Sequence, residues 1–303
     1  MSEEKKGLFF GEIVWDDVIP GGGSGKPENI GGASLNAAVH SQRLGLYSVM
    51  LSALGRDKLG EKTWELAKGL GVEMSYVTRS KLPTCLITVE FDEKGEPQYK
   101  IPPQVSWDDI EIDDAGLSRI EREGFDLFYF GTLHQRSRKS RETLYRVLEH
   151  AGFGIVYCDV NLRDPFYDAE ILHQSMAAST IVKMNDQELP KILKLVLHQE
   201  MSDLKSSMEV LLRHYGLETL IVTCGEKGAA FLTPTDWGFA PGVSVQVADT
   251  VGAGDAFSAG FLYGLCAGRG VGEACELGNK MGAFIATKKS SIPFYEKAEL
   301  DIL

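Results

Sequence analysis

Along most of the chain, segments with the apolar pattern of strands alternate with segments that have the apolar spacing of helices. Short apolar runs, typical of strands, occupy residues 11–19, 47–55, 125–133, 154–161 and 219–225. Apolar side chains at helical spacing occupy residues 31–45, 61–71, 140–152 and 208–216, and Gly45 is a C-cap candidate for the first of these helices. Strands that alternate with helices predict a mostly parallel sheet covered by helices on both faces.

Residues 84–101 depart from this alternation. They alternate apolar and polar side chains through Phe91, turn at residues 92–95 and resume as a second arm, which predicts a β-hairpin. We expect a small β flap that includes residues 13–19, with residues 21–27 at its hinge or tip; a plain surface hairpin is the alternative. The whole chain, residues 1–303, is then one domain with a lid formed by residues 13–30 and 84–105.

The glycine-rich stretch at residues 20–29, PGGGSGKPEN, raises the question of a nucleotide-phosphate loop. Gly25 and Lys26 fit the Walker pattern, but Pro20 replaces its first glycine and Pro27 replaces the hydroxyl residue that reaches the metal. Proline also removes an N–H group that would help to bind an anion. We interpret this stretch as a loop and look for the phosphate site elsewhere.

A second glycine-rich turn, Gly252–Ala253–Gly254, has the required surroundings. An alternating run through Val243, Val245 and Val247 predicts a strand before it, and a run of small and aromatic residues predicts a buried helix after it. Free N–H groups at a helix start, the helix dipole and the lack of bulky side chains predict an anion hole. Asp255 either caps this helix or accepts the proton of a hydroxyl aligned with a bound γ-phosphate.

Composition excludes several classes of function. The net charge of −12 opposes nucleic acid binding, so an anionic ligand has to be held by a local site. No apolar run approaches the ~20 residues that span a membrane, and Gly11 and Glu12 interrupt the first apolar run before a signal-peptide core forms. A cytoplasmic protein is expected. The five cysteines and six histidines are dispersed, without the spacing of a zinc site or a disulfide framework.

Two motifs at a specific separation point to a family. They are GGASLNAAVHSQRLG with the following ALGRDKLGE, and DTVGAGDAFSAGFL. Over nearly its whole length the chain resembles the ribokinase-like (PfkB) carbohydrate kinases. The segments GEIVWD, FGTLHQR, DVNLRDPFY and NDQE resemble fructokinases most. The resemblance implies a ribokinase-like, Rossmann-like three-layer α/β sandwich with a mostly parallel central sheet and a small β-sheet lid.

The activity implied by this resemblance is ATP-dependent phosphorylation of a free monosaccharide, with fructose favoured. Kinases of 2-keto-3-deoxygluconate, ribose or nucleosides are alternatives within the family, and a non-catalytic sugar or nucleotide sensor is an alternative outside catalysis. Asp255 would be the base and residues 252–254 the anion hole. The sugar site would consist of Asp16, with Asp17 as an alternative, and of Gly31, Gly32 and Asn36. Ala33 replaces the lysine usual in ribokinases, which counts against ribose.

The resemblance also assigns the remaining positions. Arg163 would lie near the substrate and the transferring phosphate, unless it forms a surface ion pair. The nucleotide side would use Asn185, Thr223 and Gly225 near the phosphates of Mg-ATP, Glu188 as a water-mediated Mg²⁺ ligand, and Asn279 beside the adenine. Asp249 and Thr250, with carbonyl groups near Ala286 and Ser290, would form a K⁺ loop; a simple Asx-turn at Asp249 is the alternative.

The basic run at residues 134–141 allows two interpretations. Its cations Arg136, Arg138, Lys139 and Arg141 lie at an expected helix start, where positive charge is unfavourable. They form either a solvated helix turn or a site for an already phosphorylated sugar. A homodimer is expected through the exposed edges of the flap, because unpaired strands recruit partners.

Overall fold

The main sheet crosses the whole molecule. The structure is a computed structural model that describes residues 4–18, 29–91, 97–296 and 299. The strand order is β13-β12-β11-β10-β9-β8-β1-β4-β5, and among these nine strands only β12 runs against the others. The strands are β1 (Lys6–Phe10), β4 (Tyr47–Gly55), β5 (Glu73–Ser80), β8 (Leu127–Phe130), β9 (Ile155–Asp159), β10 (Ile181–Asn185), β11 (Thr219–Thr223), β12 (Gly228–Leu232) and β13 (Trp237–Pro241).

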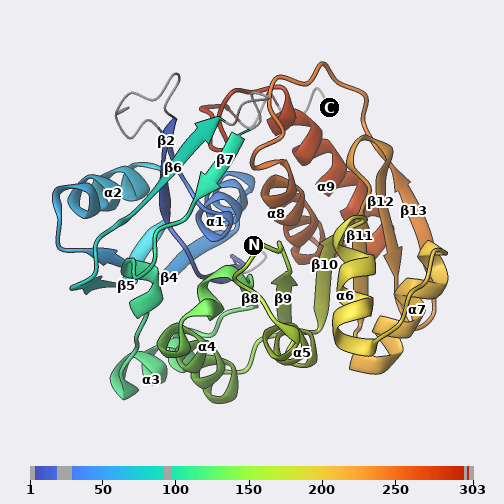
Figure 1. Ribbon diagram of the computed structural model, residues 1–303, viewed down its shortest axis with the longest axis horizontal. Helices are drawn as coiled ribbons and strands as arrows, with labels where there is room; N and C mark the ends of the chain where they lie inside the picture. Colours follow the sequence, from blue (N-terminus) through green and yellow to red (C-terminus); the bar gives the residue numbers. More distant parts are fainter. Residues whose placement is uncertain (1–3, 19–28, 92–96, 297–298, 300–303) are drawn as a thin grey trace.

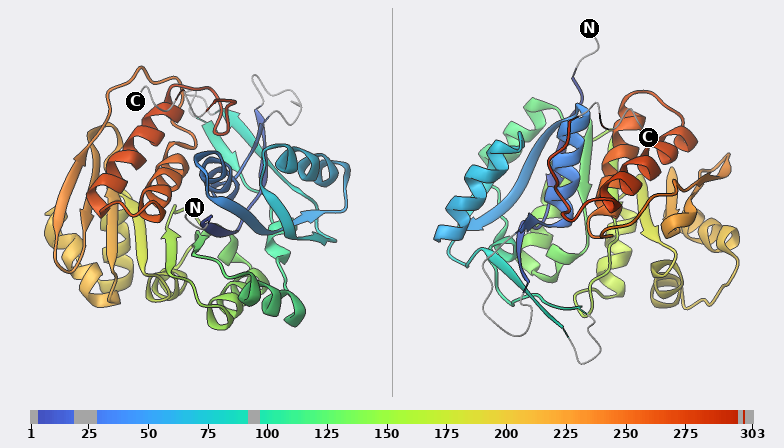
Figure 2. Two further views of the ribbon diagram at one scale, coloured as in Figure 1. Left: turned by 180° about the vertical axis from the view of Figure 1, so that it is seen from behind. Right: turned by 90° about the horizontal axis from the view of Figure 1, so that it is seen from above.

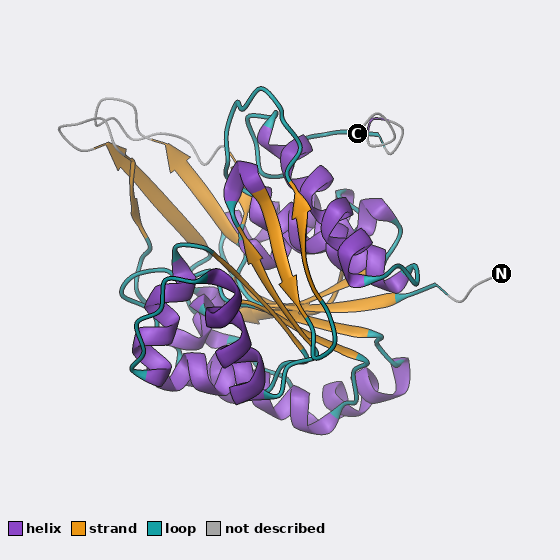
Figure 3. Ribbon diagram, turned by 90° about the vertical axis from the view of Figure 1, so that its right-hand side faces the viewer, coloured by secondary structure: helices purple, strands orange, loops and turns teal. Residues whose placement is uncertain are grey.

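Helices cover both faces of this sheet (Figures 1 and 3). They are α1 (Ala33–Leu44), α2 (Lys58–Gly69), α3 (Asp114–Glu123), α4 (Arg138–His150), α5 (Ala169–Ala177), α6 (Glu188–Leu197), α7 (Leu204–Tyr215), α8 (Ala253–Cys266) and α9 (Val271–Ala286). One apolar core joins the sheet to α1, α2, α8 and α9, and another joins it to α3–α7. Successive side chains of a strand point to opposite faces, so Phe9 enters the first core and Phe10 the second. The short apolar runs are therefore buried on both sides.

The helices predicted at residues 31–45, 61–71, 140–152 and 208–216 are present as α1, α2, α4 and α7. Gly45 ends α1 with φ of 110°, a left-handed conformation that favours glycine. Within the described residues, every helix is too short or too polar to cross a lipid bilayer.

A second sheet projects from the main body (Figure 2). It has the order β3-β2-β6-β7, with β2 (Val14–Val18), β3 (Asn29–Gly31), β6 (Cys85–Phe91) and β7 (Pro97–Lys100). Strands β6 and β7 form the antiparallel hairpin predicted at residues 84–101, with Thr88 opposite Lys100. The predicted turn at residues 92–95, the proposed tip at 21–27 and nearly all of the stretch at 20–29 lie outside the described residues.

Two strand predictions need correction. The chain leaves the main sheet at Gly11, whose φ is 144°, and a Cβ there would lie 2.2 Å from the Oγ of Ser34. The strand expected at residues 11–19 is therefore β2 of the small sheet, as expected for residues 13–19 of the flap, whereas β1, which precedes it, was not expected. The prediction of a strand at residues 243–247 is wrong, because no strand forms there. The main sheet ends with β13 at Pro241, so the segment has no neighbouring strand to pair with.

Candidate active site

A pocket of about 540 Å³, here called the acceptor pocket, lies at the carboxyl ends of β9, β10 and β11 and beneath the small sheet. Ligands of open α/β sheets bind at this edge. Its lining includes eleven residues singled out in the sequence: Asp16, Gly32, Asn36, Arg163, Asn185, Glu188, Thr223, Thr250, Gly252, Gly254 and Asp255.

A second pocket of about 750 Å³, here called the donor pocket, adjoins it. Of the predicted residues, its lining includes Thr223, Gly225, Thr250, Ala253, Gly254 and Asn279. Thr223, Thr250 and Gly254 line both pockets. The glycine turn therefore lies at the junction of two adjoining pockets.

The backbone of this turn requires glycine. Gly252 precedes α8 with φ of 81°, and a Cβ there would lie 2.6 Å from the Cβ of Ser291. The helix begins at Ala253, so Asp255 is in its first turn and does not open it. The N–H of Ala253 donates to the carbonyl of Thr250 at 3.2 Å. Among the described residues, the amides of Gly252, Gly254 and Asp255 have no hydrogen-bond partner and remain available to an anion.

Asp255 is a buried carboxylate, with 9% of its surface exposed. Burial, and next the charge of Asp159, raise its pKa to about 6. The Nδ2 of Asn36 donates to its Oδ2 at 2.7 Å and opposes this shift. A carboxylate with this pKa is ionised at neutral pH and is more basic than an ordinary aspartate. The environment of Asp255 fits a general base better than a simple helix cap. A capping side chain would accept a hydrogen bond from a backbone N–H group at the helix start, and no such bond forms here in the described chain.

The sequence analysis did not identify Lys183 as a site residue. It lies in the middle of β10, is 6% exposed and contacts the Oδ2 of Asp159 at 2.7 Å. A Cβ on Gly254 would lie 3.3 Å from its Nζ, so the ammonium group lies beside the anion hole. Ser258 also donates to Asp159, at 2.9 Å. The signal was a lysine inside the apolar run IVKMN, two residues before Asn185.

The predicted sugar residues lie on β2, on β3 and at the start of α1. Asp16 lies on β2, and burial raises its pKa to about 6; the side chain of Asp17 lies outside the described part of the chain. Gly32 precedes α1 with φ of 108°, and a Cβ there would lie 2.6 Å from the carbonyl of Glu12. Gly31 ends β3, where a Cβ would lie 3.4 Å from the Oδ1 of Asn36. This close approach joins the small sheet to the start of α1.

Arg163 lines the acceptor pocket from an exposed position. Within the described chain it forms no ion pair, and its Nη1 donates only to the carbonyl of Leu162 at 3.1 Å. Its positive charge lowers the pKa of Glu12 and opposes the raised pKa of Asp255. The arrangement favours the pocket interpretation over a surface ion pair.

Asn185 and Glu188 support each other at the start of α6. The Oδ1 of Asn185 accepts from the Glu188 amide at 2.8 Å, and the Oε2 of Glu188 accepts from the Asn185 amide at 2.8 Å. This is the reciprocal arrangement of a capping box. The Oε1 of Glu188 accepts from the Leu162 amide at 2.7 Å. Both residues therefore have a structural role, while both line the acceptor pocket. Their carboxylate and amide oxygens suit Mg²⁺ through water.

The side chains of the remaining predicted residues, Asn279, Asp249 and Ser290, form hydrogen bonds with the protein backbone. Asn279 uses its Nδ2 to hold the carbonyl groups of Ala240 and Pro241, at 2.9 and 3.1 Å, although it lines the donor pocket. Asp249 is only half-buried, and its Oδ1 accepts from the Val251 amide at 3.0 Å, which is the Asx-turn alternative. Its carboxylate thus has a partner without a cation. The Oγ of Ser290 accepts from Ile292 at 3.3 Å and lines neither pocket.

Three of the four cations of the basic run pair with carboxylates outside the acceptor pocket. Arg136 binds Asp108 through Nε and Nη2, at 2.9 and 2.8 Å, and stacks on Trp107. Arg138 pairs with Glu142, four residues on. None of the four cations is among the residues that line the acceptor pocket in the described chain. The run therefore offers no support for a phosphorylated substrate.

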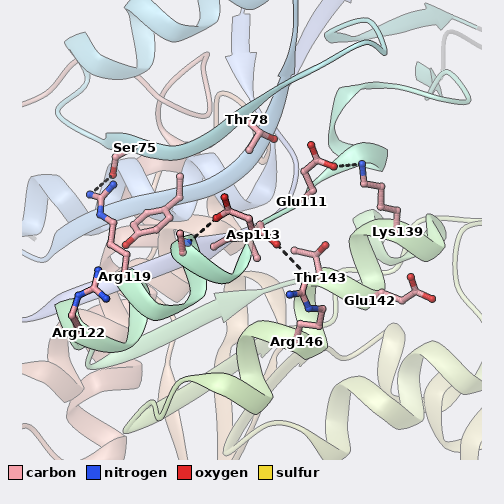
Figure 4. A pocket seen from close by; sticks show the side chains of 14 residues that line it. Ser75, Thr78, Glu111, Asp113, Arg119, Arg122, Lys139, Glu142, Thr143 and Arg146 are labelled. Atoms are coloured by element: carbon pink, nitrogen blue, oxygen red, sulfur yellow. Dashed lines mark hydrogen bonds and ion pairs between the residues drawn. The ribbon is translucent and has the colours of Figure 1, made fainter.

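A wider depression of about 820 Å³, here called the ion-pair pocket, lies beside β5, α3 and α4 (Figure 4). Most of its charged groups bind one another or their neighbours. Lys139 contacts Glu111, Arg119 contacts Glu123 at 2.7 Å, and Arg146 contacts Asp114 at 2.9 Å. It contains none of the predicted catalytic or nucleotide residues.

The similarity of this chain to known proteins agrees with the geometry of the site. The family model described as pfkB family carbohydrate kinase matches residues 27–298. The chain belongs to this family. It is a phosphotransferase with an alcohol group as acceptor, and the predicted resemblance is confirmed. The kinase is 27% identical to a probable fructokinase-5 of Arabidopsis thaliana over 94% of this chain and 93% of that relative.

Two solved structures share the fold. A double-mutant fructokinase from Vibrio cholerae O395, solved with fructose, ADP and a potassium ion, has a TM-score of 0.83 at 21% identity, over 98% of this chain and 97% of that one. Aminoimidazole riboside kinase from Salmonella enterica, solved with aminoimidazole riboside and an ATP analog, has a TM-score of 0.81 at 24% identity, over 98% and 99%. The predicted three-layer α/β fold of this kinase is confirmed.

Proposed function

We propose that this kinase transfers the γ-phosphoryl group of ATP to a hydroxyl of a free monosaccharide, with fructose as the favoured substrate. The observation that carries the proposal is Asp255: a buried carboxylate with pKa about 6 beside free amides, where the acceptor and donor pockets meet. A hydroxyl next to Asp255 would face a phosphoryl group bound by those amides. Phosphoryl transfer depends mostly on such positioning and on neutralising charge.

Each neighbouring residue then has a chemical task. Asp16 and Asn36 bind and orient the sugar, and Asp255 accepts the proton of the reacting hydroxyl. The amides of Gly252 and Gly254, with the ammonium of Lys183, stabilise the negative charge that the phosphoryl oxygens carry. Arg163 neutralises charge at the rim. Mg²⁺, held through water by Glu188 and Asn185, would supply charge neutralisation on the triphosphate.

Two further expectations belong to this proposal. K⁺ bound near Asp249 and Thr250 would stiffen the turn before Gly252, and replacing K⁺ by tetramethylammonium would then lower kcat.

A homodimer would form through β3 and β7, the edge strands of the small sheet. Sedimentation at micromolar concentration tests it, and a monomer contradicts it.

The test is a substrate panel with ATP consumption as the readout. It contains D-fructose, D-ribose, 2-keto-3-deoxy-D-gluconate, aminoimidazole riboside and D-fructose 6-phosphate. The proposal expects the highest kcat/KM with D-fructose. A preference for the riboside or the sugar acid would reject fructose but keep the kinase, whereas measurable ATP binding without transfer to any compound would favour a non-catalytic sensor.

A further inference from the structure

Glu12 is a buried acidic residue to which the proposed mechanism assigns no task. It follows β1, is 4% exposed and lines the acceptor pocket. Its Oε2 has no hydrogen-bond partner within the described chain, and the same is true of the Oδ1 of Asn36. A buried polar atom without a partner costs free energy, and a charged one costs more. Two residues with unsatisfied polar groups in the lining of one pocket indicate that these side chains serve a ligand bound there.

Within the described residues, His134 is the side chain that lies in ion-pair range of this oxygen. Its Nδ1 lies 3.5 Å from the Oε2 of Glu12, within ion-pair range but without hydrogen-bond geometry, and both of its ring nitrogens also lack partners in the described chain. Burial alone would raise the pKa of Glu12, yet the neighbouring His134 holds it below its usual value. A weak contact with His134 therefore lowers the pKa of Glu12, while Oε2 lacks a partner with full hydrogen-bond geometry in the described chain.

The root of the Glu12 side chain is fixed by the backbone. A Cβ on Gly32 would lie 2.6 Å from the Glu12 carbonyl, so the chain at Glu12 packs directly on the start of α1. The same helix carries Asn36, one turn further on. Glu12 and Asn36 are thus brought together where the segment after β1 packs on the residue before α1.

The surrounding charges specify what kind of ligand fits. Five carboxylates line the acceptor pocket, those of Glu12, Asp16, Asp159, Glu188 and Asp255. Lys183 is already paired with Asp159, which leaves Arg163 at the rim as the cation without an ion-pair partner among the described lining residues. Such a wall accepts hydrogen bonds and repels negative charge, so it suits a ligand with several hydroxyl donors and no anionic group.

We infer that Glu12 is a substrate-binding and specificity-determining residue, whose carboxylate accepts a hydrogen bond from a hydroxyl of an uncharged polyol and disfavours sugar acids and phosphosugars. The inference rests on the proposed function and narrows its substrate class. Because hydrogen bonds to charged groups are stronger than neutral ones, loss of this bond should be visible in substrate affinity.

The test compares Glu12→Gln and Glu12→Asp with wild type and with Glu142→Gln, a change at an exposed residue of α4 outside both pockets. For Glu12→Gln we expect the KM for D-fructose to rise at least tenfold, with the KM for ATP within twofold and kcat within threefold of wild type. Preference for D-fructose over 2-keto-3-deoxy-D-gluconate should fall at least fivefold. Calorimetric titration with D-fructose should show the same loss of affinity, and Glu142→Gln should match wild type.

The outcomes separate this inference from the kinase itself. If wild type phosphorylates D-fructose while both Glu12 variants keep its KM within twofold, the role of Glu12 is overturned and the proposed function stands. Loss of cooperative unfolding in both variants would assign Glu12 to the fold and also overturn the inference. A wild-type enzyme that acts only on sugar acids or phosphosugars, or on none of the sugars, would overturn the inference together with the neutral-sugar function.

Discussion

The ion-pair pocket beside α3 and the acceptor pocket beneath the small sheet are both lined by charged side chains, but these charges have opposite surroundings. In the first, Arg119, Lys139 and Arg146 are half exposed and each contacts a carboxylate. In the second, Glu12 and Asp255 are buried; an oxygen of Glu12 lacks a hydrogen-bond partner in the described chain, and the pKa of Asp255 is raised.

This difference indicates which of the two pockets is built for chemistry. Exposed ion pairs are cheap to form and contribute little to stability, so the wider pocket needs no ligand to explain it. Buried and incompletely paired charges destabilise a fold, and proteins keep them where binding or catalysis requires them. Volume alone would have pointed to the wrong pocket.

The largest expected effect is at Asp255. Asp255→Asn removes the proposed base and should lower kcat by about a thousandfold, on the scale of general base catalysis. The same change should raise the free energy of unfolding at pH 7 by on the order of 2 kcal/mol, because a buried carboxylate with a raised pKa is destabilising when ionised. Steady-state kinetics and chemical denaturation measure both, with Asp236→Asn as the control. A kcat of Asp255→Asn equal to that of the wild type would reject the proposed mechanism.

Lys183 should have the next largest effect. Lys183→Met keeps the length of the side chain but removes its charge beside the anion hole, and we expect kcat/KM to fall about a hundredfold. The exposed Lys191→Met, on α6, serves as the matched control. A fall of less than threefold would mean that Lys183 only balances the charge of Asp159.

The pH dependence should show a moderate effect. The pKa values of Asp255 and Asp16 are both raised to about 6, so both carboxylates gain a proton as the pH falls through 6. An ordinary aspartate would stay ionised there. We expect kcat/KM to fall about tenfold or more between pH 7 and pH 5. A profile of kcat/KM over pH 5–8 that stays flat would contradict the raised pKa values.

The smallest effect is expected in the ion-pair pocket. Arg146→Gln breaks an exposed pair with Asp114, so kcat/KM should change less than twofold and the free energy of unfolding by less than about 1 kcal/mol. A loss of activity above fivefold would show that this pocket communicates with the site and would weaken the contrast between the two pockets.

Much of the fold follows from local sequence. The apolar runs of β4, β8, β9 and β11 and the helical spacing of α1, α2, α4 and α7 were identified from consecutive residues. The run at residues 243–247 has the same alternation but lies beyond the last strand of the sheet. Side-chain alternation describes which faces a segment can offer, but a strand also needs a neighbour for its backbone hydrogen bonds.

By itself, the sequence determined the glycine turn before α8, the carboxylate in its first turn and the family, because these depend on residues that lie next to one another. Only the tertiary structure decided that Asp255 pairs with Asn36, 219 positions away. It also decided that Lys183 reaches Gly254 and that Glu12 has an unsatisfied oxygen. The physical reason is that a charge takes its pKa and its partners from whatever surrounds it, and in this sheet those neighbours come from distant strands and helices.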